Sequence, residues 1–311
     1  MDKQRKGEKR GIRSERHSHG EKTSEGAGKL YVVATPIGNL ADISARALAV
    51  LAEVDLIAAE DTRTTAQLLA HHGIGTSTRL TALHQHNEAG RAAGLIQTLI
   101  AGEDIALVSD AGTPGISDPG ALLVAEARAA GITVCPIPGA NAAIAALSAA
   151  GMAEQHFLFF GFLSSKSAAR RKELETLREL PHALVFYEAP HRVLECVADM
   201  AATLGGARDI VLARELTKLF ESIHRCRLSE ALAWLEGDAN RQRGEFVLIV
   251  AGAPKMEQQG LPAEAERVLR LLLNALPLKQ AVALATSITG ERKNELYDRA
   301  LTLRGPADEE D

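Results

Sequence analysis

The sequence has few of the residue types and patterns that mark several protein classes. Aromatic residues make up 4% of its 311 residues, and its three cysteines, at positions 135, 196 and 226, are widely spaced. Three such cysteines are too few for a disulfide framework or a zinc ribbon, so we expect a reducing compartment, the cytoplasm. No run approaches the roughly 18 apolar residues that cross a bilayer. The N-terminus is charged where a secretory signal would be apolar, so no membrane contact is expected.

An excess of positive charge is absent as well. The chain has 35 Lys and Arg against 40 Asp and Glu, which gives a formal net charge of −5. Such a balance creates no global basic field that would draw the protein onto nucleic acid. Any contact with RNA must therefore be local.

The dinucleotide-binding fingerprint is missing from the end of the first predicted strand. That fingerprint needs three glycines and an acidic residue about twenty positions later. The segment ATPIGNLAD holds one glycine, Gly38. An ordinary Rossmann dehydrogenase or Rossmann methyltransferase is therefore disfavoured.

The chain does have alternating apolar and amphipathic segments from Leu30 onward, a rhythm that predicts β-α-β units. We expect two α/β domains, each with a mostly parallel sheet covered on both faces, over residues 29–151 and 152–253. Residues 1–28 form a predicted disordered basic tail and 306–311 an acidic one. Residues 261–305 predict three short helices, the last two with helix-turn-helix spacing. Strands are expected in the apolar runs LYVVAT (30–35) and VDLIAA (54–59), and further at 105–109, 132–136, 157–160, 183–187, 210–213 and 246–250.

Loops after the predicted strands have the composition of ligand sites. The segment DAGTPGISDPG, from Asp110 to Gly120, holds three Gly, two Pro and two Asp. Glycines allow a ligand to approach the backbone closely, and prolines reduce the entropy lost on binding. A helix of small residues begins near Asn141, where unpaired amides could bind oxygens of a cofactor.

Charged residues gather at other strand ends and predict a shared cleft. They are Glu60, Asp61, Arg63, Glu188, His191, Arg192, Arg214, Glu215, Lys218 and Glu221. Purely structural ion pairs are the alternative for any one of them. The segment around His84, His86, Asn87 and Glu88 lacks the spacing of a metal shell, so no metal is expected and a role in orienting a sugar or base is favoured.

Taken together, the segments TPIGNLAD, AEDTR, HQHNE, DAGTPGISDPG, IPGANAAIAALSAAG, LVFYEAPHR, RELTK and RGEFVLIV resemble the tetrapyrrole methylase superfamily. More narrowly they resemble its ribosomal branch, which adds a 2′-O-methyl group to a cytidine (position 1402) in the decoding region of 16S rRNA. The resemblance runs from Leu30 to Ala251, and residues 261–303 resemble the helix-turn-helix appendage of that branch. It implies a homodimeric enzyme of two α/β domains that binds S-adenosylmethionine in the cleft between them and acts on the small ribosomal subunit.

The resemblance also implies which residues contact the cofactor. By position they are Pro36, Ala111, Gly112, Thr113, Ile116, Asn141, Ala142, Glu188 and Leu216. Methyl transfer to a ribose hydroxyl needs positioning and a group that removes the proton. From charge location alone, the candidates for that group are Asp61, Glu188 and Lys218, the last if its pKa is lowered.

Candidate substrate contacts follow from the same charges. They are Arg63, His84, Asn87, Arg192 and Arg214, with Arg63 and Arg214 on phosphates. We expect Arg170, Arg171, Lys172 and the helical appendage to form a local basic stripe for RNA in a folded ribosomal particle.

Two alternatives stay open at this point. One is a methylase that acts on a corrin or sirohaem-type tetrapyrrole. The other is a non-enzymatic helix-turn-helix regulator whose α/β part senses a ligand, although the mixed charge of residues 293–301 gives little support for reading the major groove.

Overall fold

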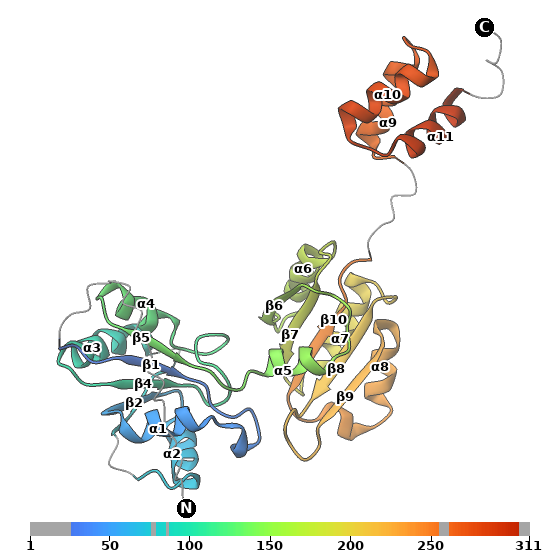
Figure 1. The fold of residues 1–311 in the computed structure, drawn as a ribbon. Coiled ribbons are helices and arrows are strands. Elements are labelled where there is room, and N and C mark those ends of the chain that lie inside the picture. The colour runs from blue at the N-terminus through green and yellow to red at the C-terminus, as the bar shows by residue number, and fades with distance from the viewer. Residues whose placement is uncertain (1–25, 76–78, 85–86, 255–260, 305–311) are drawn as a thin grey trace, which may run out of the picture. The chain divides into compact units, whose positions relative to one another are not determined.

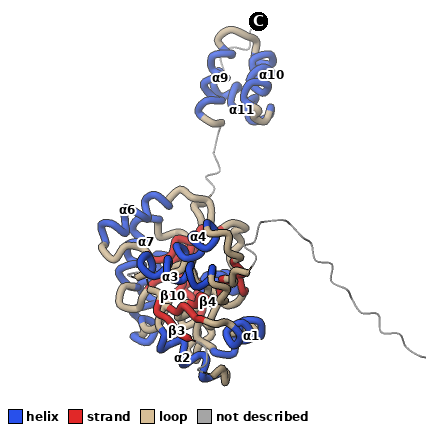
Figure 2. Tube along the Cα trace, turned by 90° about the vertical axis from the view of Figure 1, so that its left-hand side faces the viewer, coloured by secondary structure: helices blue, strands red, loops and turns tan. Residues whose placement is uncertain are grey.

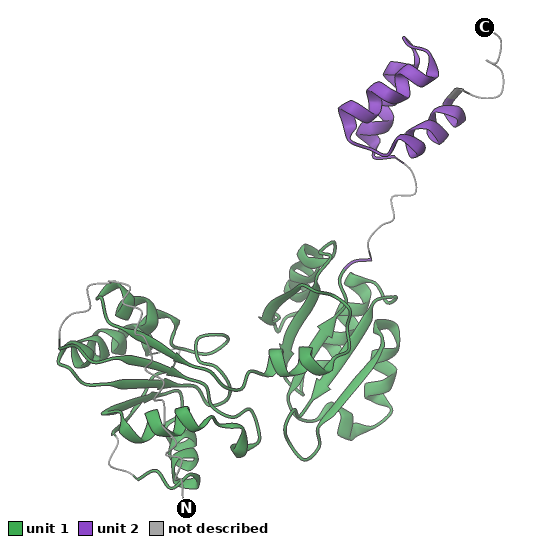
Figure 3. Cartoon of the chain, viewed as in Figure 1, with its two compact units in different colours: residues 1–252 green, residues 253–311 purple. Residues whose placement is uncertain are grey.

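The computed structural model describes residues 26–75, 79–84, 87–254 and 261–304. The chain divides into two compact units, residues 1–252 and 253–311 (Figure 3). The predicted acidic tail and all but the last residues of the predicted basic tail lie outside the described residues, as does His86.

The first sheet of unit 1 is fully parallel, as predicted. Its strand order is β3-β2-β4-β1-β5. Helices α1 and α2 cover one face, and α3 and α4 cover the other (Figure 1). Every residue of β4 is buried because both faces of this central strand are covered. The elements are β1 (Leu30–Val33), α1 (Ala45–Glu53), β2 (Leu56–Ala59), α2 (Thr62–His71), β3 (Arg79–Ala82), α3 (Glu88–Ile100), β4 (Ile105–Val108), α4 (Ala121–Ala129) and β5 (Val134–Ile137), with a short 3-10 helix η1 (Leu40–Asp42).

The second sheet has the order β6-β7-β10-β8-β9, and only the β6–β7 pair is parallel. The prediction of a mostly parallel second sheet is therefore wrong. Residues 215–221 join β8 to β9, and β10 lies between β7 and β8, antiparallel to both. The sequence SIHRCR of β9 alternates in burial and has no apolar run, so the strand was not predicted. The elements are β6 (Phe157–Phe162), α6 (Ser167–Leu177), β7 (Ala183–Glu188), α7 (Val193–Leu204), β8 (Asp209–Arg214), β9 (Ser222–Arg227), α8 (Leu228–Glu236), η2 (Ala239–Gln242) and β10 (Phe246–Val250).

Helix α5 (Ala142–Ala149) ties the two halves of unit 1 together. It follows β5 of the first sheet but packs on β7 and β10 of the second. Its buried residues Ala143 and Ala146 share a core with Val185, Val211 and Ile249. Helices α6, α7 and α8 cover the opposite face of that sheet, so strands lie inside unit 1 and helices outside (Figure 2).

Unit 2 consists of the three predicted helices, α9 (Ala263–Leu273), α10 (Leu278–Thr289) and α11 (Lys293–Arg304). Gly290 ends α10 in the left-handed conformation, with φ of 73°, which glycine adopts at little cost. Leu269, Val282 and Leu296 form the centre of a small core. No helix in the described part of the chain is long and apolar enough to cross a membrane.

Candidate functional site

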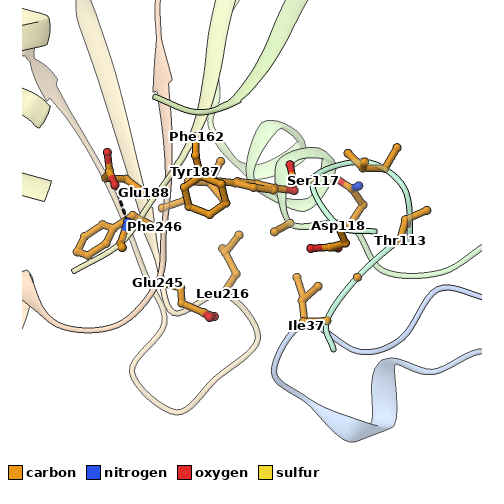
Figure 4. Close-up of a pocket in the computed structure, with 18 of the residues that line it drawn as sticks. Ile37, Thr113, Ser117, Asp118, Phe162, Tyr187, Glu188, Leu216, Glu245 and Phe246 are labelled. Atoms are coloured by element: carbon orange, nitrogen blue, oxygen red, sulfur yellow. Dashed lines mark hydrogen bonds between the residues drawn. The ribbon is translucent and has the colours of Figure 1, made fainter. Parts of the chain in front are cut away.

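A cavity of about 330 Å³ lies among the loops at the carboxyl ends of strands from both sheets. We call it the first cavity (Figure 4). In parallel α/β sheets this edge is where ligands bind. Its walls are Ile37, Ala111, Gly112, Thr113, Ile116, Ser117, Asp118, Asn141, Ala142, Phe162, Tyr187, Glu188, Ala189, Pro190, Ala213, Leu216, Lys218, Glu245, Phe246 and Val247.

The loop after β4 follows a fixed path along one wall. Thr35 and Gly112 pair through two backbone hydrogen bonds, of 2.9 and 3.1 Å. Gly112 has φ of +84°, and an added Cβ there would lie 3.4 Å from Cγ2 of Ile37. The Thr113 hydroxyl donates to the carbonyl of Ala140 at 3.1 Å. This glycine therefore keeps open a backbone surface that a ligand can approach closely.

The first turn of α5 forms the adjoining wall. The Asn141 side chain caps the helix by accepting a hydrogen bond from Ile144 N at 3.1 Å. The amide of Ala143 donates to the Tyr187 hydroxyl at 3.3 Å, which links α5 to the end of β7. A capped helix terminus lined by small side chains leaves room for a flat group against it.

Asp118 places a carboxyl group in the first cavity. Figure 4 shows its side chain pointing into the space between the two halves of unit 1. Burial and the neighbouring charge of Glu60 raise its pKa to about 6. The nearby side chain of Ser109 has the opposite effect on this pKa and offsets part of the rise. Sequence reasoning missed this residue, although the aspartate-containing loop was singled out.

The connection between β8 and β9 lies close to the loop after β1. Glu215 and Thr217 both have positive φ, 52° and 65°, which costs free energy in residues other than glycine. The amide of Asn39 donates to the Thr217 hydroxyl at 3.1 Å. A Cβ on Gly38 would lie 2.5 Å from Cγ of Lys218, so only glycine fits this contact. Strained residues thus hold Lys218 against the loop after β1.

A second cavity, of about 310 Å³, adjoins the first. Ile37, Ala111, Lys218 and Glu245 line both. The other residues of the second cavity are Pro36, Gly38, Leu40, Thr64, Thr65, Gln67, Leu68, Ser109 and Asp110.

The sequence matches two known protein families. Residues 29–232 match the family described as Tetrapyrrole (Corrin/Porphyrin) Methylases, and residues 259–304 match the RsmI C-terminal HTH domain. The chain belongs to the tetrapyrrole methylase family. It is a methyltransferase.

Two relatives from bacteria show high identity. A protein of Pseudomonas aeruginosa (strain PAO1) described as ribosomal RNA small subunit methyltransferase I is 57% identical, over 90% of this chain and 99% of that protein. A protein of Escherichia coli O157:H7 with the same description is 55% identical, over 89% of this chain and 96% of that protein.

Solved structures of other family members share the fold. The methyltransferase CobJ has a TM-score of 0.55 at 21% identity and covers 73% of this chain and 95% of its own. A uroporphyrin-III C-methyl transferase from Thermus thermophilus, complexed with S-adenosyl homocysteine, has a TM-score of 0.52 at 16% identity. The match covers 72% of this chain and 97% of that one. At these identities the likeness concerns the fold alone.

Within this methylase fold, eight of the nine predicted cofactor contacts line the first cavity. Pro36 is the ninth and lines the second cavity. The eight are Ala111, Gly112, Thr113, Ile116, Asn141, Ala142, Glu188 and Leu216.

Each of the three predicted proton acceptors, Asp61, Glu188 and Lys218, forms an ion pair. A hydrogen-bonded ion pair with Arg63 lowers the pKa of Asp61 to about 2. Glu188 is 2% exposed, and its Oε1 accepts from Arg192 at 2.6 Å, on the face of β7 that packs on α7. Figure 4 shows this carboxylate turned away from the cavity.

Lys218 is the third predicted proton acceptor. Burial lowers its pKa, but hydrogen bonds to Glu245 at 2.8 Å and Glu215 at 2.9 Å raise the pKa above its ordinary value. The expectation of a lowered lysine pKa is therefore wrong.

None of the five predicted substrate residues lines either cavity. The Arg63 side chain is 85% exposed, next to the second cavity on α2. The Asn87 side chain accepts from His84 N at 2.8 Å at the start of α3. Arg192 pairs with Glu188. Arg214 donates to the Ser222 hydroxyl, to the carbonyl of Phe220 in the β8–β9 connection and to the carbonyl of Arg243 before β10.

The prediction that Arg170 belongs to an exposed basic stripe is wrong. This residue is 0% exposed, and its guanidinium pairs with the buried Asp199 at 2.7 Å. Arg171 also pairs with Asp199, although its side chain is 58% exposed. The sequence ARRKEL could not distinguish a buried arginine from an exposed one because both lie on the same amphipathic helix.

Proposed function

We propose that this protein transfers a methyl group from S-adenosylmethionine to the ribose 2′-oxygen of cytidine 1402, in the decoding region of 16S rRNA within the small ribosomal subunit of the cytoplasm. The observation that carries the proposal is the similarity, above 50% identity along most of the chain, to proteins described as ribosomal RNA small subunit methyltransferase I.

The residues of the first cavity suit this methyl donor. Its volume lies in the range that encloses a small molecule. Ile37, Ala213 and Leu216 give it apolar surface for a nucleoside, and the missing side chain at Gly112 lets a ligand approach the backbone closely. When bound, S-adenosylmethionine supplies a methyl group activated by a positively charged sulfur. The carboxylate of Asp118 complements that charge.

Asp118 is the proton acceptor in this proposal. An acceptor hydroxyl must come close to the methyl donor, so the group that takes its proton must also line the first cavity. Three acidic residues line it, Asp118, Glu188 and Glu245, but the carboxylate of Glu188 turns away from the cavity. Arg192 holds Glu188, and Lys218 holds Glu245, whose side chain is 76% exposed. Among the described residues of this wall, Asp118 alone has no cationic partner.

The raised pKa of Asp118 suits this role. A carboxylate with a pKa of about 6 is ionised at neutral pH yet more basic than an ordinary aspartate. Lys218, kept charged by Glu215 and Glu245, helps to position the acceptor at the wall that the two cavities share.

The test of this function is methyl transfer with labelled S-adenosylmethionine to small ribosomal subunits, naked 16S rRNA and a porphyrinogen. We expect label in the subunits, located at the 2′-oxygen of one decoding-region cytidine by ribose-methylation mapping. Label in the porphyrinogen, or on a base atom of the RNA, would refute the proposal.

We also propose that the enzyme acts as a homodimer. Large apolar side chains of unit 1 are exposed in a single copy, among them Phe157 at 47%, Leu219 at 89% and Phe220 at 66%. A second copy would bury such side chains favourably. Sedimentation velocity at micromolar concentration should give the mass of two chains, and a single-chain mass would contradict this.

A further inference from the structure

The second cavity contains polar groups that the fold leaves unused. Thr64 and Gln67 lie one helical turn apart on the exposed side of α2, and both face this cavity. Among the described residues, neither the Thr64 hydroxyl nor the Gln67 carboxamide has a side-chain hydrogen bond. Leu40 and Leu68 add apolar surface beside them. The wall therefore combines apolar area with free donors and acceptors, which is the composition of a small-molecule site.

The position of this cavity relates it to methyl transfer. It shares Ile37, Ala111 and Lys218 with the first cavity, so its contents lie next to the donor's. Ser109, which lines the second cavity, lies close enough to Asp118 of the first to lower the pKa of that carboxyl group. A hydroxyl group at the shared wall would meet the methyl donor on one side and the proposed proton acceptor nearby.

The size of the cavity narrows the choice of occupant. About 310 Å³ encloses one nucleoside, whereas a tetrapyrrole macrocycle with its acidic side chains is several times larger. Enzymes that modify a nucleotide commonly take it out of the stack into such a pocket and read its base edge by hydrogen bonds. A carboxamide offers both a donor and an acceptor for a pyrimidine edge.

We propose that the second cavity is the acceptor subsite, which holds one unstacked pyrimidine nucleoside with its base edge at Gln67 and its ribose at the shared wall. This inference rests on the proposed function. Leu40 and Leu68 pack against the base, and Thr64 borders it. The ion pair between Lys218 and Glu245 fixes the wall at which the ribose lies.

Two variants test the subsite. Gln67→Leu keeps the side-chain size and removes the carboxamide, and Thr64→Phe fills the cavity. We expect the first to lower kcat/KM for small subunits about tenfold, the loss typical of one hydrogen bond, and the second to lower it further. The Kd of S-adenosylmethionine, measured by calorimetry, should stay unchanged in both. Gln97→Leu, at an exposed position on α3 outside both cavities, is the matched control.

A second substrate separates base recognition from a general structural effect. Subunits reconstituted with RNA that lacks the base at the target nucleotide should be methylated equally by wild type and Gln67→Leu, because the contact is then missing in both.

The possible results are distinguishable. Unchanged kcat/KM in both variants, or an equal loss with the baseless substrate, would overturn the subsite. A parallel loss of S-adenosylmethionine binding would assign the cavity to the donor and overturn it as well. If the wild-type enzyme methylates no RNA at all, the proposed function itself fails and the acceptor subsite with it.

Discussion

Replacing Asp118 by Asn tests the centre of the proposed chemistry. The change keeps the shape of the side chain and removes its charge and its ability to accept a proton. Positioned general bases contribute about 10²- to 10⁴-fold to rate, so we expect kcat to fall by at least about 10²-fold. Binding of the methyl donor should weaken far less, because Ile37, Gly112 and Leu216 still form its walls.

The pH dependence of the wild-type enzyme follows from the same residue. Its pKa of about 6 lies above the ordinary 3.8 because burial and the charge of Glu60 disfavour the carboxylate. A raised pKa means that the proton acceptor is lost as the pH falls through about 6. With that pKa, about 90% of the side chains are ionised at pH 7 and about 10% at pH 5, so kcat/KM should fall about tenfold over this interval.

The pH dependence is measured as kcat/KM for S-adenosylmethionine, which reports the pKa of the enzyme with an empty cavity. Single-turnover methylation of small subunits at saturating S-adenosylmethionine measures the loss of chemistry in Asp118→Asn separately from donor binding. Glu53→Gln, at an exposed position at the end of α1, is the control for loss of a carboxylate. In Asp118→Asn the tenfold change between pH 5 and 7 should disappear. A wild-type rate that is flat over this interval, or a variant whose defect lies only in the donor Kd, would refute the assignment.

Three further predictions concern contacts elsewhere in the molecule. Gly38→Ala should destabilise unit 1 by about 1–3 kcal/mol in urea unfolding and lower methylation, because its Cβ would overlap Lys218, whereas Gly94→Ala, with free space around it, should not destabilise. Arg170→Met should lower the free energy of unfolding by about 3–5 kcal/mol because it leaves Asp199 buried without its main partner, and the half-exposed Arg171→Met should cost much less. Arg63→Ala should weaken binding of small subunits and reduce the slope of log K against log salt by about 1 if Arg63 contacts a phosphate, and an unchanged slope would place that contact elsewhere.

Four of the five strands of the first sheet could be predicted from sequence, and its edge strand β3 was not predicted; the second sheet could be predicted only in part. Buried strands such as β4 are continuous apolar runs, which the sequence displays directly. Edge strands such as β9 bury one face only, and their hydrophobic signal is weak. Strand direction in the second sheet depends on where β10 inserts, between β7 and β8, and no local pattern encodes that insertion.

The donor site was predictable for a different reason than the proton acceptor. Glycine and proline mark places where the backbone must approach a ligand, so Gly112 and the start of α5 could be found in the sequence. The acidity of a carboxyl group depends on what surrounds it in three dimensions. Asp61 and Asp118 look alike in sequence, yet a hydrogen bond to Arg63 lowers the pKa of one and burial raises the pKa of the other.

The distribution of ion pairs around the two cavities explains how one carboxylate is left basic. Arginine or lysine neutralises Asp61, Glu188 and Glu245, and each of these pairs also fixes a loop. Asp118 has no ion-pair partner among the described residues. Burial and the charge of Glu60 outweigh the opposite effect of Ser109, so its pKa stays raised until a cation enters the cavity. Because S-adenosylmethionine is such a cation and its demethylated product is not, Asp118→Asn should weaken binding of S-adenosylmethionine more than binding of S-adenosylhomocysteine. Equal losses for the two ligands in calorimetry would show that Asp118 does not respond to the charge on the sulfur.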